Sequence, residues 1–235
     1  MRRIVGKLNF LASSTRPDIA YATHQIARFV SKPKIKHTKA VEWLTRYLMG
    51  TRNRGYVIKP DPSKSVEIYV DADFAGNWDP ELAGVDPDTA RSRHGFVVFL
   101  AGVPLLWKSS LQQEHALSST ESELIGLSMA LKTTIPMMEM LQEMTELGFD
   151  VGNGTKALHC ELFEDNNGAL LLATKHRITN RTKYFLVKWH FFWSHVNNGD
   201  VTMLKIDTKL QCADYMTKWL PREFFGSNRK LVQGW

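Results

Sequence analysis

Four separated acidic residues have the types and positions of metal ligands. Asp71 follows the strand-like run VEIYV, and Asp165 follows the strand-like run LHCELFE. Glu123 lies near the start of the helical run TESELIGL, and Asp214 lies near the start of ADYMTKWL. Because strand ends and helix starts meet at one edge of an α/β sheet, we expect these four carboxylates to lie close together.

Converging carboxylates are suited to a pair of divalent cations that hydrolyse a phosphodiester. Two-metal hydrolysis requires several carboxylates around ions about 3.5–4 Å apart. Oxygen ligands favour Mg²⁺, with Mn²⁺ as an alternative, and either ion also binds phosphate oxygens of a substrate. Taken singly, each acid has a simpler explanation, since Asp often forms the turn after a strand and acids in a first helical turn complement the helix dipole. The prediction therefore depends on the four residues together.

Two further acids lie next to this set. Asp73 follows Asp71 by two residues and points to the same face if the strand continues, so we expect it to have a secondary role. Glu121 precedes Glu123 in the same helical run. A residue of the run Ser118–Thr120 is expected to cap that helix.

The elements that position these acids change character near residue 55. Three helical patterns fill the first part of the chain, over residues 4–11, 19–30 and 37–49. Four short runs of β-branched and aromatic residues, over residues 55–59, 66–73, 95–102 and 104–110, then predict three or four antiparallel strands. A loop rich in Asp, Pro and Gly is expected over residues 77–93.

Helices alternate with further strands over the rest of the chain. Helical periodicity covers residues 121–131, 136–147, 169–174, 184–196 and 211–220, and strands are predicted at 158–165 and 201–206. This order predicts an α/β domain over residues 55–235, with a mixed five-stranded sheet flanked by helices. Residues 1–54 form a helical N-terminal extension in this prediction.

Lysine and arginine dominate the first 54 residues. Residues 1–54 contain twelve basic and two acidic residues, a net charge of +10, whereas the remainder carries −4. A second basic stretch, residues 166–199, contains five Lys and Arg residues and no acid. Such segments indicate contact with a polyanion such as a phosphate backbone. A solvated helical face is the alternative, and the charge count leaves both open.

Other features of the sequence exclude several protein classes. The longest nearly uncharged stretch, residues 95–107, is shorter than the roughly 18 apolar residues of a membrane span. No cleavable secretion signal is present. Cys160 and Cys212 have no CxxC spacing and are interpreted as buried thiols rather than a disulfide or zinc site. We therefore expect an intracellular protein, in a cytoplasmic particle or the nucleus, without a membrane partner.

Four local motifs carry a family resemblance. EIYVDADFAG, ALSSTESELIGL, FEDNNGAL and QCADYMTKWL resemble the four motifs of the ribonuclease H domain in copia-type retrotransposon polyproteins. Residues 2–51 resemble the segment that joins reverse transcriptase to this domain. The resemblance implies a ribonuclease H-like fold, with Asp71, Glu123, Asp165 and Asp214 as ligands of two Mg²⁺ ions. It favours Glu123 over Glu121, because the family motif places its ligand at the second acid of the pair.

The resemblance also implies a substrate and partners. The expected reaction is hydrolysis of the RNA strand of an RNA–DNA hybrid, in which one metal activates a water and the other stabilises the leaving 3′ oxygen. The expected partners are the hybrid and the reverse transcriptase portion of a parent polyprotein. Contacts to the nucleic-acid backbone are predicted for two residues beside the metal ligands, Ser118 and Asn166, and for two in the basic stretch, Arg181 and Lys183.

The sequence departs from the family pattern after Lys183. Six aromatic residues lie between Tyr184 and Trp193, and we interpret them as core residues, with base stacking or sequence drift as alternatives. Some ribonucleases H carry a mobile His near the last carboxylate. Neither His190 nor His195 is expected to have that role, since a lone His is more often packed or solvated.

Two rival functions remain at this stage. The first is a catalytically inactive fragment that only binds nucleic acid or packs against a lost polymerase. No Tyr-x-Asp-Asp polymerase motif occurs in the chain. The chain is then expected to be the C-terminal part of a larger element or a truncated copy. The second is an integrase-type enzyme, which would use a D…D…E order and an upstream zinc-binding His/Cys region. Neither feature is found in the sequence.

Overall fold

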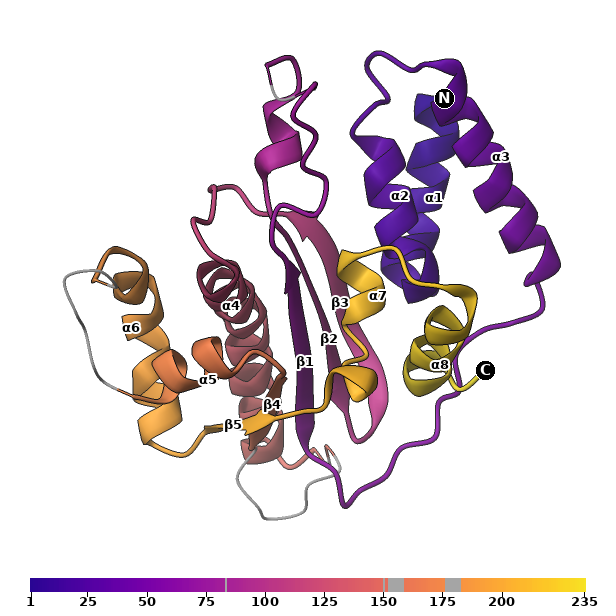
Figure 1. Cartoon of the computed structure of the whole chain (residues 1–235). Helices are drawn as coiled ribbons and strands as arrows, with labels where there is room; N and C mark the ends of the chain where they lie inside the picture. The colour runs from indigo at the N-terminus through magenta and orange to yellow at the C-terminus, as the bar shows by residue number, and fades with distance from the viewer. Residues whose placement is uncertain (83, 150, 152–158, 176–182) are drawn as a thin grey trace.

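A five-stranded mixed sheet forms the centre of the molecule (Figure 1). The computed structural model describes residues 1–82, 84–149, 151, 159–175 and 183–235, with side chains described for all of these except 183–188 and 191. The strand order is β3-β2-β1-β4-β5, with β1 at Val66–Asp73, β2 at Arg93–Leu100, β3 at Val103–Leu111, β4 at Cys160–Glu164 and β5 at Val201–Lys205. β2 is antiparallel to β1 and β3, whereas β4 is parallel to β1 and β5. The predicted mixed five-stranded sheet is confirmed.

The hairpin between β2 and β3 has the local chemistry of a tight turn. Its central residues, Ala101 and Gly102, have φ angles of 51° and 73°. Positive φ at both positions is characteristic of the two-residue turns whose twist matches that of the paired strands. The hairpin therefore joins the two runs predicted as strands over residues 95–102 and 104–110, and its turn uses the last two residues of the first run.

The strand predicted at residues 55–59 is wrong. This segment is an extended linker, in which the side chains of Val57 and Ile58 are exposed. The Val57 N–H donates to the carbonyl of Gln233 at 3.0 Å, so its backbone pairs with the C-terminal end of the chain instead of a strand. The β-branched residues indicated a strand, but a strand requires a partner that this segment does not have within the described sheet.

Three helices precede the sheet, as predicted. They are α1 at Arg2–Ser14, α2 at Ala20–Ala27 and α3 at Ile35–Gly50, and a short 3-10 turn occupies Pro17–Ile19. Their buried apolar side chains form a cluster of their own. The helices also contact the β3 side of the sheet, where the Trp107 indole N–H donates to the carbonyl of Ala12 at 2.6 Å. Helix α2 ends earlier than the periodicity to Val30 predicts.

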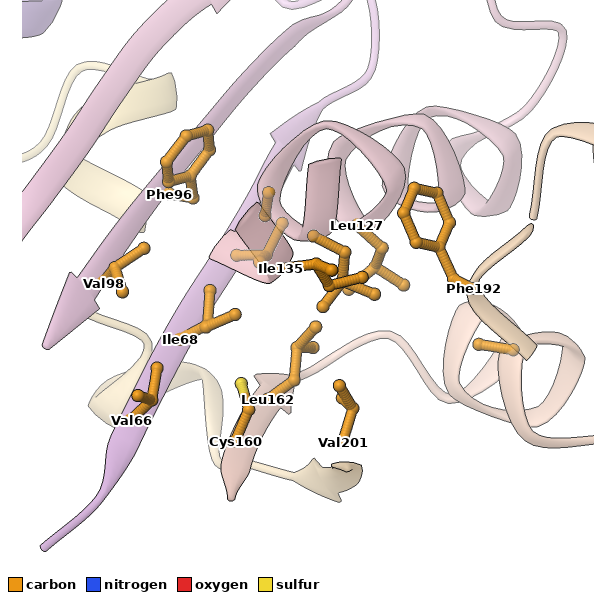
Figure 2. Packing of buried hydrophobic residues seen from close by; sticks show 14 of the residues in the cluster. Val66, Ile68, Phe96, Val98, Leu127, Ile135, Cys160, Leu162, Phe192 and Val201 are labelled. Carbon is orange, nitrogen blue, oxygen red and sulfur yellow. The ribbon is translucent and has the colours of Figure 1, made fainter. Parts of the chain in front are cut away.

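A single long helix, α4 at Ser119–Glu146, covers one face of the sheet. The sequence predicts two helices separated near Pro136, and that division is wrong. Apolar side chains on both sides of the proline are buried against the sheet, which keeps the helix continuous despite the backbone hydrogen bond lost at Pro136. Figure 2 shows Leu127 and Ile135 among the side chains of β1, β2 and β4. By length and composition α4 could cross a membrane, but 56% of its apolar window is buried in this core.

The aromatic helix closes the other side of this core. Helices α5 at Asn167–Thr174 and α6 at Lys183–Asn197 follow β4. Trp189, Phe192 and Trp193 are buried, and both indole N–H groups donate to the carbonyl of Ala173, at 2.9 and 3.1 Å. The interpretation of the aromatic segment as core is confirmed for these three residues. The side chains of the other three aromatic residues lie outside the described part.

The C-terminal region differs from the predicted helix at 211–220. A 3-10 turn at Thr208–Leu210 precedes a four-residue helix, α7 at Asp214–Thr217, and a further helix, α8 at Arg222–Gln233, follows. Gln211 lies outside a helix, and its side-chain amide donates to the carbonyl of Val70 at 2.8 Å. Helix α8 was missed, although Pro221 before it and Gly234 after it are recognised start and stop signals.

A buried polar network joins the N-terminal helices to α8. The Asp18 carboxylate accepts from the Arg16 guanidinium at 2.7 and 2.9 Å, from the Tyr47 hydroxyl at 2.6 Å and from the Gln233 amide at 3.3 Å. The Arg229 guanidinium donates to the Tyr47 hydroxyl at 3.2 Å. These bonds fix the N-terminal helices against the end of the chain. The domain boundary near residue 55 stays a prediction.

Replacement of Asp18 by Ala tests this network. The substitution leaves the Arg16 guanidinium buried without its carboxylate, so we expect the free energy of unfolding to fall by about 3–5 kcal/mol. Denaturant unfolding followed by circular dichroism measures this change. The exposed acid of α3, Glu42, provides the control, since Glu42→Ala is expected to change stability by less than about 0.5 kcal/mol. Equal effects of the two substitutions would show that the network does not stabilise the fold.

Candidate metal centre

The first acid of the centre comes from the middle strand. Asp71 lies near the end of β1 and is buried, with 3% of its surface exposed. It lies opposite Gly95 of β2. A Cβ atom on Gly95 would lie 2.4 Å from the Met216 side chain, so the glycine allows α7 to pack directly on the sheet beside Asp71. This close approach brings the groups of α7 to the same edge.

The second acid comes from the start of α4. The Ser118 hydroxyl caps this helix by accepting from the Glu121 N–H at 3.1 Å, and the Glu121 carboxylate accepts from the Leu117 N–H at 2.8 Å. Glu121 therefore serves the helix cap, whereas Glu123 lies one half-turn further on, with 5% of its surface exposed. One carboxylate oxygen of Glu123, Oε2, is buried without a hydrogen-bond partner among the described residues.

The third acid follows the neighbouring parallel strand. Asp165 comes directly after β4, and Asn166 then caps α5 by accepting from the N–H groups of Gly168 and Ala169 at 2.9 and 3.1 Å. Asp71, Glu123 and Asp165 each offer a carboxylate oxygen, and these oxygens all lie within 4.8 Å of one another. A divalent cation fits this set, because it would neutralise adjacent carboxylates and give the buried Glu123 oxygen a partner.

The fourth predicted acid, Asp214, is linked to this group through a lysine. The Lys218 ammonium lies 2.8 Å from Asp214 Oδ1 and 3.6 Å from Asp71 Oδ1. The Thr217 hydroxyl donates to Asp71 Oδ2. Asp214 is not among the three acids within 4.8 Å of one another. The structure thus brings together three of the predicted ligands and holds the fourth beside them.

Three residues at this centre were not predicted from the sequence: Glu164, Thr217 and Lys218. Thr217 and Lys218 follow Asp214 at the i+3 and i+4 positions. In a helix, this spacing predicts that both side chains lie near Asp214. Glu164 is the last residue of β4 and is fully buried, with its Oε1 accepting from the Asn166 N–H at 2.9 Å. The alternation of side chains along the strand could have predicted that Glu164 is buried, because Glu164 shares a face with Leu162 of the core.

Burial and mutual repulsion raise the pKa values of the clustered acids. Burial raises the pKa of Glu123, and the charges of Glu164 and Asp71 raise it further. Burial also raises the pKa of Glu164 to about 8. Burial and the Asp71 charge raise the pKa of Asp214 to about 7 against the opposing effect of Lys218.

Two further charged residues, Lys218 and Asp73, lie at the same edge of the sheet. Burial lowers the pKa of Lys218, but the nearby charges of Asp71 and Asp214 outweigh this effect and raise it overall, so the ammonium stays charged. Asp73 is half-buried, and burial together with Asp71 raises its pKa. More acids than cations therefore meet at this edge, and additional positive charge would stabilise their ionised forms.

The other residues that the sequence analysis singled out lie outside the acidic group or outside the described part of the chain. Ser118 is exposed, and Ser118 and Asn166 both act as helix caps, so their nucleic-acid contacts stay predictions. Arg181 and the side chain of Lys183 lie outside the described residues. His190 packs edge-on against Trp193, and His195 lies 3.2 Å from Asp200. The interpretation of Cys160 and Cys212 as buried free thiols is confirmed.

Comparisons with known proteins give close relatives in sequence. The chain is 34% identical over 224 residues to a retrovirus-related Pol polyprotein from transposon RE1 of Arabidopsis thaliana, covering 95% of the chain and 14% of that protein. It is 32% identical over 229 residues to the Pol polyprotein from transposon TNT 1-94 of Nicotiana tabacum, covering 97% of the chain and 16% of that protein. The chain thus spans about a seventh of the length of these relatives. No family model matches it.

The solved structures give a weaker likeness. A crystal structure of LC11-RNase H1 in complex with an RNA/DNA hybrid is 16% identical, covers 65% of the chain and 93% of that protein, and has a TM-score of 0.40. The RNase H1 from Halobacterium salinarum is 15% identical over 63% of the chain, also with a TM-score of 0.40.

The buried carboxylate of Glu164 makes stability depend on pH. Its pKa in the folded chain is about 8, above the value of about 4.3 in the unfolded chain, so the fold binds more protons and loses stability as the pH rises between these values. In metal-free buffer, we expect Glu164→Gln to be more stable than the wild type, with a difference that grows by up to about 1.4 kcal/mol per pH unit between about pH 6.5 and 8. Thermal unfolding in EDTA measures this difference.

Between about pH 6.5 and 8, the pH dependence of stability comes from the acids and not from the buried histidines. Burial lowers the pKa values of His24 and His94 to about 4 and about 3, and these groups produce the opposite dependence only below the usual histidine pKa of about 6.5. Glu161→Gln on the same strand, at a half-buried position, is the matched control for the replacement of a carboxylate by an amide. A pH-independent difference for Glu164→Gln would contradict the raised pKa.

Proposed function

Because the chain belongs to the copia-type retrotransposon Pol polyproteins, we propose that it is their ribonuclease H portion and hydrolyses the RNA strand of RNA–DNA hybrids. The observation that carries this proposal is the meeting of Asp71, Glu123 and Asp165. Three carboxylates from a strand, a helix start and a second strand end supply the oxygen-rich ligand set of a phosphodiester hydrolase.

The proposed ligands divide between two cation positions. Asp71, Glu123 and Asp165 would hold one Mg²⁺ ion, and Asp214 would share the second with Asp71. Mn²⁺ has the same ligand preference and is a possible substitute. When bound, the two ions supply an ionised water nucleophile and neutralise the charge that develops on the leaving 3′ oxygen.

The residues around the ligands hold them in place. The Thr217 hydroxyl orients one oxygen of Asp71, and the Ser118–Glu121 cap fixes the start of the helix that carries Glu123. The Asn166 side chain caps α5 directly after Asp165. Fixed ligands keep the attacking and leaving groups in one geometry, which is a large part of the rate acceleration in phosphoryl transfer.

The proposed substrate is recognised through its shape and backbone. An RNA–DNA hybrid presents 2′-hydroxyls and phosphates in a wide minor groove, while its deep groove hides the base edges. We propose that polar groups at the exposed start of α4, including Ser118, contact this backbone. The reverse transcriptase portion of a parent polyprotein is the second proposed partner, and it would deliver the hybrid.

Cleavage of a labelled hybrid tests the proposal. The wild-type chain is expected to cut the RNA strand in Mg²⁺ and not in EDTA. Asp165→Asn should lower the rate more than about 100-fold, because loss of even the outer partners of metal ligands costs 10–100-fold. Glu139→Gln makes the same chemical change at an exposed position of α4 and should leave the rate unchanged.

Two results would contradict the proposal. Equal rates for the wild type and Asp165→Asn would remove Asp165 from the site. Hybrid binding by the wild type without Mg²⁺-dependent or Mn²⁺-dependent cleavage would instead favour a catalytically inactive fragment that binds nucleic acid.

A further inference from the structure

A basic cavity lies between the N-terminal helices and the loop that follows β1. Its volume is about 480 Å³, and its walls come from the connection between α2 and α3 and from the β1–β2 loop. Two contacts hold the walls together: the Gln25 amide donates to Asn77 Oδ1 at 2.8 Å, and Arg28 lies 3.3 Å from Asp86. Figure 1 shows both segments at the end of the sheet where β1 finishes.

The cavity has more positive than negative charge. Four cationic side chains line it, Arg28, Lys32, Lys34 and Lys36, against the two carboxylates of Asp79 and Asp86. Arg28 already pairs with Asp86, and Asp79 accepts from the backbone N–H groups of residues 81 and 82. Within the described part of the chain, no ion pair joins the three lysines to a carboxylate. All three are exposed.

The segment that carries the lysines is held by local packing. The rings of Phe29 and His37 stack with centroids 4.2 Å apart, and the Arg28 guanidinium lies 5.2 Å from the Phe29 ring. The Lys34 N–H donates to His37 Nδ1 at 3.0 Å. Three like charges are thus carried within five residues of a segment that these contacts hold, and an anion that contacts all three would be attracted by their combined charge.

We propose that Lys32, Lys34 and Lys36 form a second nucleic-acid contact, which binds the phosphate backbone of the duplex beyond the metal centre. This inference rests on the proposed function, because a duplex held by the acids at the end of β1 continues past the same end of the sheet. The loop from Asp73 leads directly from the centre to one wall of the cavity. A phosphate backbone offers repeated charges to a row of exposed lysines without reading sequence.

Binding of a fluorescent hybrid in EDTA tests this contact without any cleavage. The test variant is Lys32→Gln/Lys34→Gln/Lys36→Gln in the full chain. The control variant is Arg46→Gln/Arg52→Gln/Lys59→Gln, which removes the same charge from exposed residues at the end of α3 and in the linker. Thermal unfolding of both variants first establishes that each is folded like the wild type.

The expected result is a weaker and less salt-dependent complex for the test variant. With a hybrid of about 24 base pairs, its Kd should rise about tenfold or more at low salt, and the slope of log Kd against log salt between about 50 and 200 mM NaCl should fall by about 2–3. The control variant should keep a slope closer to the wild type. A hybrid of about 8 base pairs, too short to reach both regions, should show a smaller difference between test and control.

Other outcomes separate this inference from the proposed function. Equal Kd and slope for the test and control variants would overturn the lysine contact, while Mg²⁺-dependent cleavage by the wild type would still support the metal centre. Conversely, a selective loss of binding in the test variant supports the contact even if the wild-type chain does not cleave.

Discussion

Several carboxylates are buried side by side at the end of β1, and the surrounding structure must hold them there against their mutual repulsion. Asp71, Glu123 and Glu164 lose most of their contact with water, and each raises the energy of the others when ionised. Such a group of acids persists only if the elements that carry it are anchored elsewhere. The large apolar core between α4, the sheet and α6 provides that anchor.

Helix α7 and the residue after it hold the Asp71 side chain in position, although the helix has only four residues. Its Thr217 and the adjacent Lys218 both contact Asp71, while Gly95 allows its backbone to approach the sheet. Its position is fixed from several sides. The Ser109 hydroxyl donates to the Met216 carbonyl, and α2 and α8 contact α7 from outside. The N-terminal helices therefore support the edge where the acids meet as well as adding positive charge to the chain.

Both acidic and basic side chains are concentrated at one end of the sheet. The acids gather where the proposed cations and scissile phosphate would meet, and the exposed lysines near the α2–α3 connection lie at the same end of the sheet. A polyanion alone would be repelled by the acidic edge. In the proposed complex, basic groups nearby would offset that repulsion and hold the backbone in place, so that the acids need only hold the ions, which would in turn bind the reacting phosphate.

The sequence by itself determined the mixed sheet, the three N-terminal helices and the order of the four acids. These are local signals, because strand alternation, helical periodicity and motif spacing are all read over a few neighbouring residues. The same signals failed at residues 55–59, where a strand-like run found no strand to pair with, and at Pro136, where burial against the sheet kept a helix whole.

Only the tertiary structure decided which groups meet. It gave Glu121 its role in the helix cap, left Asp214 outside the three acids that lie within 4.8 Å of one another, and added Glu164, Thr217 and Lys218 to the centre. It also brought the lysines near residue 34 against a loop more than forty residues further along the chain. The physical reason is that burial and charge interaction depend on distances through space, set by the packing of the whole sheet, and sequence spacing contains those distances only within one element.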